Sequence, residues 1–255
     1  MSREATASQQ ALSKVPALTL GFWAIKILAT TLGETGGDAV SMSLDLGYLV
    51  STGIFMALFV IAVAGQIRAK QFHPWLYWAT IIASTTVGTT LADFADRSLG
   101  IGYLGGSTLL ACLVAATLVA WHRSLGSIDV GSVHTPKAEA FYWLTIMFSQ
   151  TLGTALGDWT ADSAGLGYTG AALIFAALLL LIVLAYYFTR VSRTALFWLA
   201  FVLTRPLGAV IGDYLDKPVA AGGLEFSRFT ATGVLLVAIA LLIWLLQQRA
   251  ADRSH

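Results

Sequence analysis

The sequence has very little charge and almost no cysteine. Only 11% of its 255 residues are Asp, Glu, Lys or Arg, against about 25% in an average soluble domain. That is too little charge to cover the surface of a soluble globule. The single cysteine, Cys112, excludes an internal disulfide and a cysteine-based zinc site. The formal net charge of +1 excludes a strongly basic nucleic-acid binder, so we expect no nucleic-acid partner.

Apolar residues make up 57% of the chain and gather in long runs. Runs of about 20 residues are long enough to cross a bilayer as a helix. The runs do not alternate with polar residues, as the strands of a membrane β-barrel do. We therefore expect an all-α polytopic membrane protein, with one membrane domain over residues 1–255 and the lipid bilayer as its partner. The eight expected spans are residues 16–37, 45–67, 75–95, 101–122, 139–160, 166–189, 195–214 and 226–247.

Lys and Arg residues are distributed unequally between the two sets of span ends. Ten of the fifteen flank one set, which the positive-inside rule places in the cytoplasm. This set includes both chain termini, with Arg3 and Arg253, and residues 125–137, which we expect to form a cytoplasmic linker between two halves. The opposite loops hold three basic residues, which are Arg97, Lys217 and Arg228.

A fourfold internal repeat organises the sequence. Each unit begins with a Trp, followed ten residues later by a Gly and fifteen residues later by an Asp. Each is expected to be a hairpin of two spans, so all four units have the same orientation in the membrane. The first spans can surround one axis or form two separate four-helix halves. The repeats cover about residues 16–70, 71–124, 138–192 and 193–248, and their tryptophans are Trp23, Trp78, Trp143 and Trp198.

This pattern resembles a bacterial membrane-protein family of four tandem two-helix repeats of unknown function, each with a characteristic tryptophan. The resemblance extends from about Trp23 to Trp244. It is carried by residues 30–38 (Thr-Thr-Leu-Gly-Glu-Thr-Gly-Gly-Asp) and residues 204–208 (Thr-Arg-Pro-Leu-Gly). It implies eight spans in the bacterial inner membrane, and it implies no activity or ligand.

Small and aromatic residues of the repeat have expected structural roles. Small residues four apart allow two helices to approach closely in lipid. The tryptophans are expected to anchor the first spans at the cytoplasmic interface, and Tyr48, Tyr103 and Tyr168 to anchor the second spans at the outer one. The glycines expected at helix contacts are Gly33, Gly37, Gly88, Gly153, Gly157, Gly208 and Gly212.

One face of each first span carries polar residues 3, 7, 11 or 15 positions after the tryptophan. At 1.5 Å per residue, position 11 falls near the middle of a bilayer core and position 15 nearer its outer side. Neutral oxygens come from Thr30, Thr85, Thr89, Gln150 and Thr154. The acids are Glu34, Asp38, Asp93, Asp158 and Asp213, and the bases within the spans are Lys26 and Arg205.

Five acids facing two bases leave a formal excess of three negative charges. Charged groups at such depth are costly and must be paired, neutralised or hydrated. The excess therefore favours protonated carboxyls, a bound cation, or water that reaches the outer acids. Two structural alternatives stay open: the aspartates can end their helices at a hydrated surface, and Glu34 can pair with Lys26 or Arg205.

These residues favour a membrane transporter. Carboxylate, hydroxyl and amide oxygens suit a hard divalent cation, for which we expect Mn²⁺ or Mg²⁺ bound by the five acids and the neutral oxygens. Lys26 and Arg205 would then tune the site or couple it to protons. In one alternative, the two bases hold a small anionic organic solute; in another, the protein is structural and transports nothing. No enzyme activity and no resident cofactor are expected, and the sequence does not specify an oligomeric state.

Overall fold

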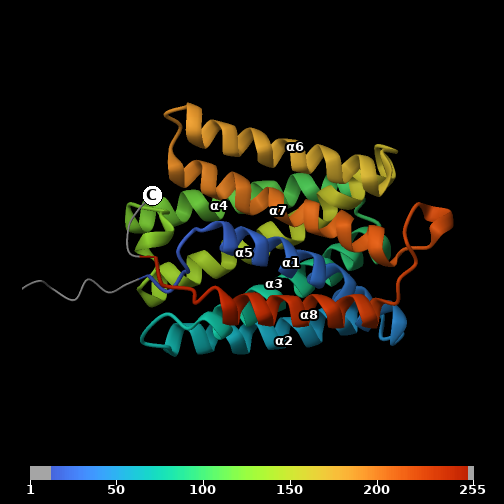
Figure 1. The fold of residues 1–255 in the computed structure, drawn as a ribbon, viewed down its shortest axis with the longest axis horizontal. Coiled ribbons are helices and arrows are strands. Elements are labelled where there is room, and N and C mark those ends of the chain that lie inside the picture. Colours follow the sequence, from blue (N-terminus) through green and yellow to red (C-terminus); the bar gives the residue numbers. More distant parts are fainter. Residues whose placement is uncertain (1–12, 252–255) are drawn as a thin grey trace, which may run out of the picture.

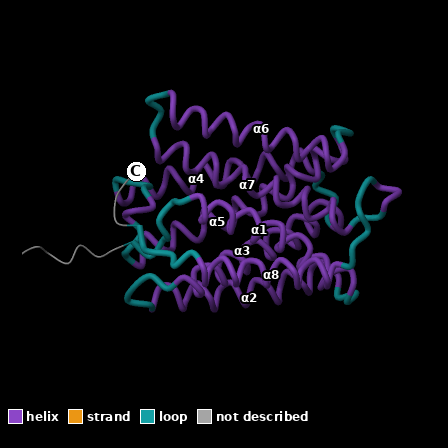
Figure 2. The backbone as a smooth tube through the Cα atoms, in the orientation of Figure 1, coloured by secondary structure: helices purple, strands orange, loops and turns teal. Residues whose placement is uncertain are grey.

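The computed structural model describes residues 13–251 and is a bundle of long helices (Figures 1 and 2). Arg3 and Arg253 lie outside the described residues. The helix ends agree with the expected spans to within four residues. The eight long helices are α1 (Leu20–Asp38), α2 (Gly47–Arg68), α3 (Pro74–Asp93), α4 (Tyr103–Leu125), α5 (Pro136–Asp158), α6 (Gly167–Phe188), α7 (Arg193–Asp216) and α8 (Arg228–Leu245).

Five of these helices are long and apolar enough to cross a membrane, judged by length and composition alone. They are α2, α4, α6, α7 and α8. The other three, α1, α3 and α5, are the first helices of their repeats and carry many buried polar side chains. Their polar residues point into the bundle rather than toward its surroundings, which lowers their mean hydropathy without exposing polar surface.

The first helices of the four repeats form one closed ring. α1 packs on α3, α3 on α5, α5 on α7, and α7 returns to α1. Of the two arrangements that the sequence left open, the structure has the single ring rather than two separate four-helix halves. In Figure 1, α1, α3, α5 and α7 lie between α6 at one edge and α2 at the other.

The second helix of each repeat packs mainly on the first helix of the next repeat. α2 packs on α3, α4 on α5 and α6 on α7, while α8 closes the circle on α1. Each repeat contains two consecutive helices, as expected, but the hairpin expectation is wrong as to packing, because these two helices pack on neighbouring repeats rather than on each other. The connection between the two helices of a repeat carries the second helix sideways onto the next repeat, so neighbouring repeats hold each other together.

A π-helical turn and a glycine make this connection. π-helical turns follow α1, α3 and α5, at Ala39–Ser43, Phe94–Ser98 and Trp159–Ser163. The glycine lies 24 residues after each tryptophan and has a positive φ of 72°, 78°, 63° and 86° in successive repeats. Only glycine adopts this conformation without strain. These four glycines, which the sequence analysis overlooked, are Gly47, Gly102, Gly167 and Gly222.

The repeat tryptophans lie inside the protein, between helices at one end of the ring. Trp78, Trp143 and Trp198 are buried and Trp23 is partly buried. They pack edge to face with neighbouring rings such as Tyr142. The prediction of interfacial tryptophan anchors is therefore wrong, because these side chains fill the space between helices at one end of the ring.

The same end of the ring is covered by the two ends of the described chain. Pro16 pairs with Ala250 as an isolated β-bridge. Lys14 forms a buried ion pair with Glu139 at 2.7 Å, and the Ser13 hydroxyl donates to the Val130 carbonyl in the linker at 2.6 Å. The aromatic end of the ring is thus sealed by chain segments that are distant in sequence.

Candidate functional site

Every polar residue predicted to form the site lies in the ring. The four helices contribute equivalent residues to four successive layers, and all sixteen residues are at most 3% exposed. From the aromatic end outward, the first layer is Lys26, Ile81, Ile146 and Phe201, and the second is Thr30, Thr85, Gln150 and Arg205. The third layer is Glu34, Thr89, Thr154 and Ala209, and the fourth is Asp38, Asp93, Asp158 and Asp213.

Glycines allow the layers to form. A Cβ atom at Gly33, Gly88, Gly153 or Gly208 would overlap the second-layer residue of the next helix around the ring. Each glycine faces the next helix in the same sense around the ring. Gly153 of α5 faces Arg205 of α7, and Gly208 of α7 faces Thr30 of α1, which completes the circle. One turn further on, Gly37, Gly157 and Gly212 face the third-layer residues Thr89, Ala209 and Glu34.

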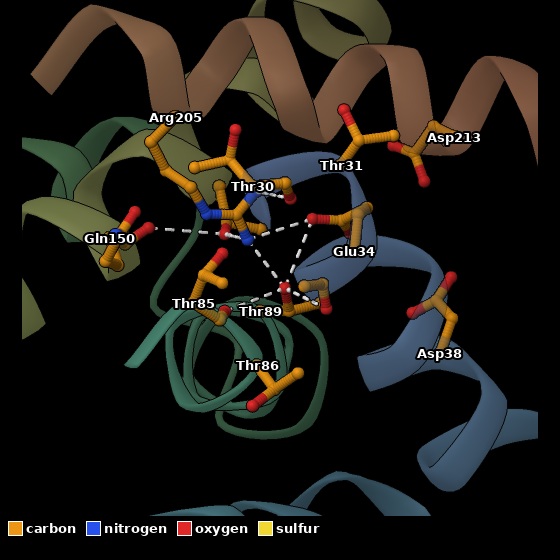
Figure 3. Close-up of polar contacts among 12 residues, drawn as sticks. Thr30, Thr31, Glu34, Asp38, Thr85, Thr86, Thr89, Gln150, Arg205 and Asp213 are labelled. Carbon is orange, nitrogen blue, oxygen red and sulfur yellow. Dashed lines mark hydrogen bonds and ion pairs between the residues drawn. The ribbon is translucent and has the colours of Figure 1, made fainter. Parts of the chain in front are cut away.

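Arg205 and Glu34 form a buried ion pair at the centre of the ring (Figure 3). Arg205 Nη2 donates to Glu34 Oε2 at 3.0 Å. It also donates at 2.6 Å to each of the hydroxyls of Thr89 and Thr154. All four ring helices therefore meet at one guanidinium group. Of the two partners open to Glu34, the structure has Arg205 and not Lys26.

Two basic residues from the connecting segments pair with all four carboxylates of the aspartate layer. Arg97 contacts Asp93 at 2.8 Å and Asp158 at 3.5 Å. Lys217 forms ion pairs with Asp38 and, at 3.1 Å, with Asp213. Asp38, Asp93 and Asp158 do end α1, α3 and α5, as one alternative expected, but all four carboxylates are buried and paired and are therefore not hydrated helix ends.

The predicted excess of three negative charges is also too large. Arg97 and Lys217 belong to the cluster, so five acids face four bases and the formal excess is one. Arg228 adds a further charge but pairs with buried Asp216 at 3.0 Å. The sequence count placed these bases in separate outer loops. In the fold, the connecting segments bend over the end of the ring and bring them onto the aspartates.

The five predicted metal-binding acids separate into two groups. One oxygen from each of Glu34, Asp38 and Asp213 lies within 4.8 Å of the others, close enough for a single metal ion. Asp93 and Asp158 are not in this group; they share Arg97 instead. Within the part of the chain that the structure describes, Asp38 Oδ1 has no hydrogen-bond partner.

Lys217 is the cation closest to this group of three carboxylates. Burial by itself would lower the pKa of Lys217, but the carboxylates of Asp213 and Asp38 outweigh it and hold that pKa well above its usual range. The ammonium group therefore stays charged at neutral pH. It is paired with Asp38 and Asp213, which are two of the three carboxylates that a metal ion would need.

Arg97 and Lys217 belong to the buried cluster, and the sequence had not placed them there. Each lies four residues after its repeat's aspartate, in the second and fourth repeats. Each bridges that aspartate to the aspartate of the following repeat. The signal was present as a basic residue at one fixed position in alternate repeats, where the other two repeats have Met42 and Asp162.

The family described as Repeat of Unknown Function (DUF347) matches the chain four times, over residues 21–72, 76–127, 141–192 and 196–250. The chain belongs to this family. Each DUF347 repeat contains one ring helix and one outer helix, as the resemblance implied. Searches of curated proteins and of solved structures found no match.

Proposed function

We propose that this protein is a membrane transporter whose cargo passes through the ring of α1, α3, α5 and α7. The cargo is a hard divalent cation, Mn²⁺ or Mg²⁺. The proposal rests on one observation, the approach of Glu34, Asp38 and Asp213 to within 4.8 Å of one another in a buried site. Oxygen ligands of this kind suit hard cations.

Charge balance allows a divalent ion to take the place of the Lys217 ammonium. Three carboxylates paired with Arg205 and Lys217 retain one negative charge. A divalent ion that displaced the Lys217 ammonium would leave three negative charges balanced by the ion and Arg205. Buried charges are stable when they are balanced. Binding of the cation is thus coupled to release of the Lys217 ammonium from the carboxylates.

Divalent cations should stabilise the purified protein, and this response should depend on Glu34. In detergent, we expect saturable stabilisation by Mn²⁺ or Mg²⁺, about 2.7 kcal/mol at a concentration 100-fold above Kd. Glu34→Gln should abolish this response, because the amide keeps an acceptor for Arg205 but loses the charge that the metal needs. Thermal unfolding across a panel of divalent ions measures this, and metal uptake into reconstituted vesicles measures transport.

Two variants give this experiment matched controls. Asp158→Asn removes a carboxylate from the same layer but outside the group of three, so it should keep the metal response. Lys217→Met removes the competing ammonium and should tighten metal binding. If no divalent ion stabilises the wild type, or if the Glu34→Gln variant responds equally, the cation proposal fails. A protein that also carries no cargo in vesicles would be structural.

We further propose that all eight long helices cross the bacterial inner membrane, with both termini in the cytoplasm. The unequal distribution of Lys and Arg supports this orientation. So does the pairing of Pro16 with Ala250, because an even number of crossings returns both ends to one side.

The accessibility of single cysteines tests this topology. With Cys112 replaced by Ser, we expect Ala220→Cys to react with a membrane-impermeant maleimide in intact cells. His134→Cys, in the linker, should react only after the membrane is opened. The opposite pattern would reverse the orientation.

A further inference from the structure

We infer that the inner half of the ring contains a binding site for a small monovalent anion, a halide or a short carboxylate. The site lies between the first and second layers and includes Lys26, Thr85, Gln150 and Arg205. It lies toward the aromatic end from the carboxylate group proposed for cations, although Arg205 also pairs with Glu34 of that group. Lys26 and Asp38 are twelve residues apart on α1, about 18 Å along a helix. The inference does not depend on the cation proposal.

Unpartnered hydrogen-bond donors mark this site. Among the described residues, no acceptor is bonded to Lys26 Nζ, Thr85 Oγ1, Gln150 Nε2 or Arg205 Nε. All four side chains are 0% exposed. Gln150 also leaves its carbonyl oxygen without a partner. Buried donors are normally satisfied, because a donor left without an acceptor keeps the full cost of its removal from water. Four at adjacent levels of one ring indicate a missing acceptor.

The glycine contacts fix these donors at neighbouring levels. Thr85 packs against Gly33, Gln150 against Gly88 and Arg205 against Gly153, which places all three in one closed layer. Figure 3 shows Thr85 and Gln150 on helices beside Arg205. Lys26 lies one helical turn toward the aromatic end, and its Nζ is 4.2 Å from the centroid of the Phe201 ring.

The local charge favours an anion. The first and second layers contain Lys26 and Arg205, and the nearest acid, Glu34, already accepts from Arg205 at 3.0 Å. Lys26 Nζ has no carboxylate within ion-pair distance among residues 13–251, so a bound anion would be the partner that keeps this amine protonated. One monovalent anion would balance this charge and accept from the unused donors. The floor of the site is formed by Ile81, Ile146 and Phe201, which supply no polar group and therefore favour a small ligand.

Anion-dependent stability of the full-length protein tests the inference. Thermal unfolding is measured in detergent with chloride or formate replacing gluconate at constant ionic strength and without divalent ions. We expect saturable stabilisation by chloride or formate. Lys26→Met and Gln150→Leu should each weaken apparent binding by about tenfold to a hundredfold, the loss that a charge-assisted hydrogen bond accounts for.

Matched variants separate this site from general effects. Thr86→Val removes a hydroxyl next to Thr85 that already donates to the Ile82 and Ala83 carbonyls of its own helix, so it should keep wild-type anion binding. Glu34→Gln should keep or strengthen it while losing the divalent response, so the two proposals fail independently. An equal effect of chloride, formate and gluconate would overturn the inference, and so would a saturable response that survives in the Gln150→Leu variant. If Lys26→Met does not fold, Gln150→Leu decides.

Discussion

Replacing Arg205 with Met will destabilise the protein by about 3–5 kcal/mol, the cost of leaving one member of a buried ion pair without its partner. Glu34 is 2% exposed, and its Oε2 accepts from Arg205 at 3.0 Å. Without the guanidinium, the carboxylate has no basic partner within ion-pair distance in the described chain. The hydroxyls of Thr89 and Thr154 also lose their donor. Denaturant unfolding in detergent measures the loss.

A double-mutant cycle shows whether the loss comes from the ion pair. Glu34→Gln removes the charge that Arg205→Met would leave unpaired. We therefore expect the double variant to be more stable than Arg205→Met alone, with a coupling free energy of about 0.5–3 kcal/mol, as found for residues in contact. Strict additivity would mean that Arg205 stabilises the ring through packing against Gly153 alone. The cycle thus separates the contribution of the Arg205 charge to the free energy of unfolding from the contribution of its aliphatic stem.

Much of the architecture could be predicted because it depends on local patterns. Helix positions follow from apolar runs, and their ends agreed with the structure to within four residues. The inward face followed from the spacing of residues such as Thr30 and Glu34, both of which are buried in the ring. The fixed offset of glycines within each repeat marked the helix contacts, since every repeat packs in the same way.

The errors arose where contacts join different repeats. Nothing local in the sequence shows that α2 packs on α3 rather than on α1, so the hairpin expectation failed. The charge count failed for the same reason. Arg97 and Lys217 lie beyond the aspartates in sequence but fold back over them. The tryptophans are buried because the closed ring surrounds them with other helices. The residue pattern of one helix alone does not predict this burial.

The second large effect is expected at the ring glycines, where Gly33→Leu should prevent the ring from closing. A single added Cβ at Gly33 already overlaps the side chain of Thr85. A full leucine side chain at this position would force α1 and α3 apart, and with them the remaining layers. We expect a loss of at least about 4–5 kcal/mol, in the range reserved for severe core disruption. The folded fraction after size-exclusion chromatography in detergent, together with thermal unfolding, measures it.

Glycines outside the ring provide the control. A Cβ at Gly53 in α2 or Gly233 in α8 meets no atom within 4 Å. Replacing either with Leu should be neutral or slightly stabilising, because Gly costs about 0.8–1 kcal/mol relative to Ala in a helix interior. Equal damage at ring and outer positions would show that helix propensity or detergent binding, and not ring closure, controls assembly.

Moving the glycine to the facing helix tests the geometry directly. All three atoms nearest to a Cβ at Gly33 belong to the side chain of Thr85. Gly33→Ala alone should therefore destabilise the ring by about 1–3 kcal/mol, the usual cost of overpacking. Combining it with Thr85→Gly vacates the same space from the other side, so the pair should be more stable than the sum of its single variants predicts. At Gly208 the facing atoms include backbone of Thr30, which no side-chain substitution removes, so Gly208→Ala should resist the same rescue by Thr30→Gly.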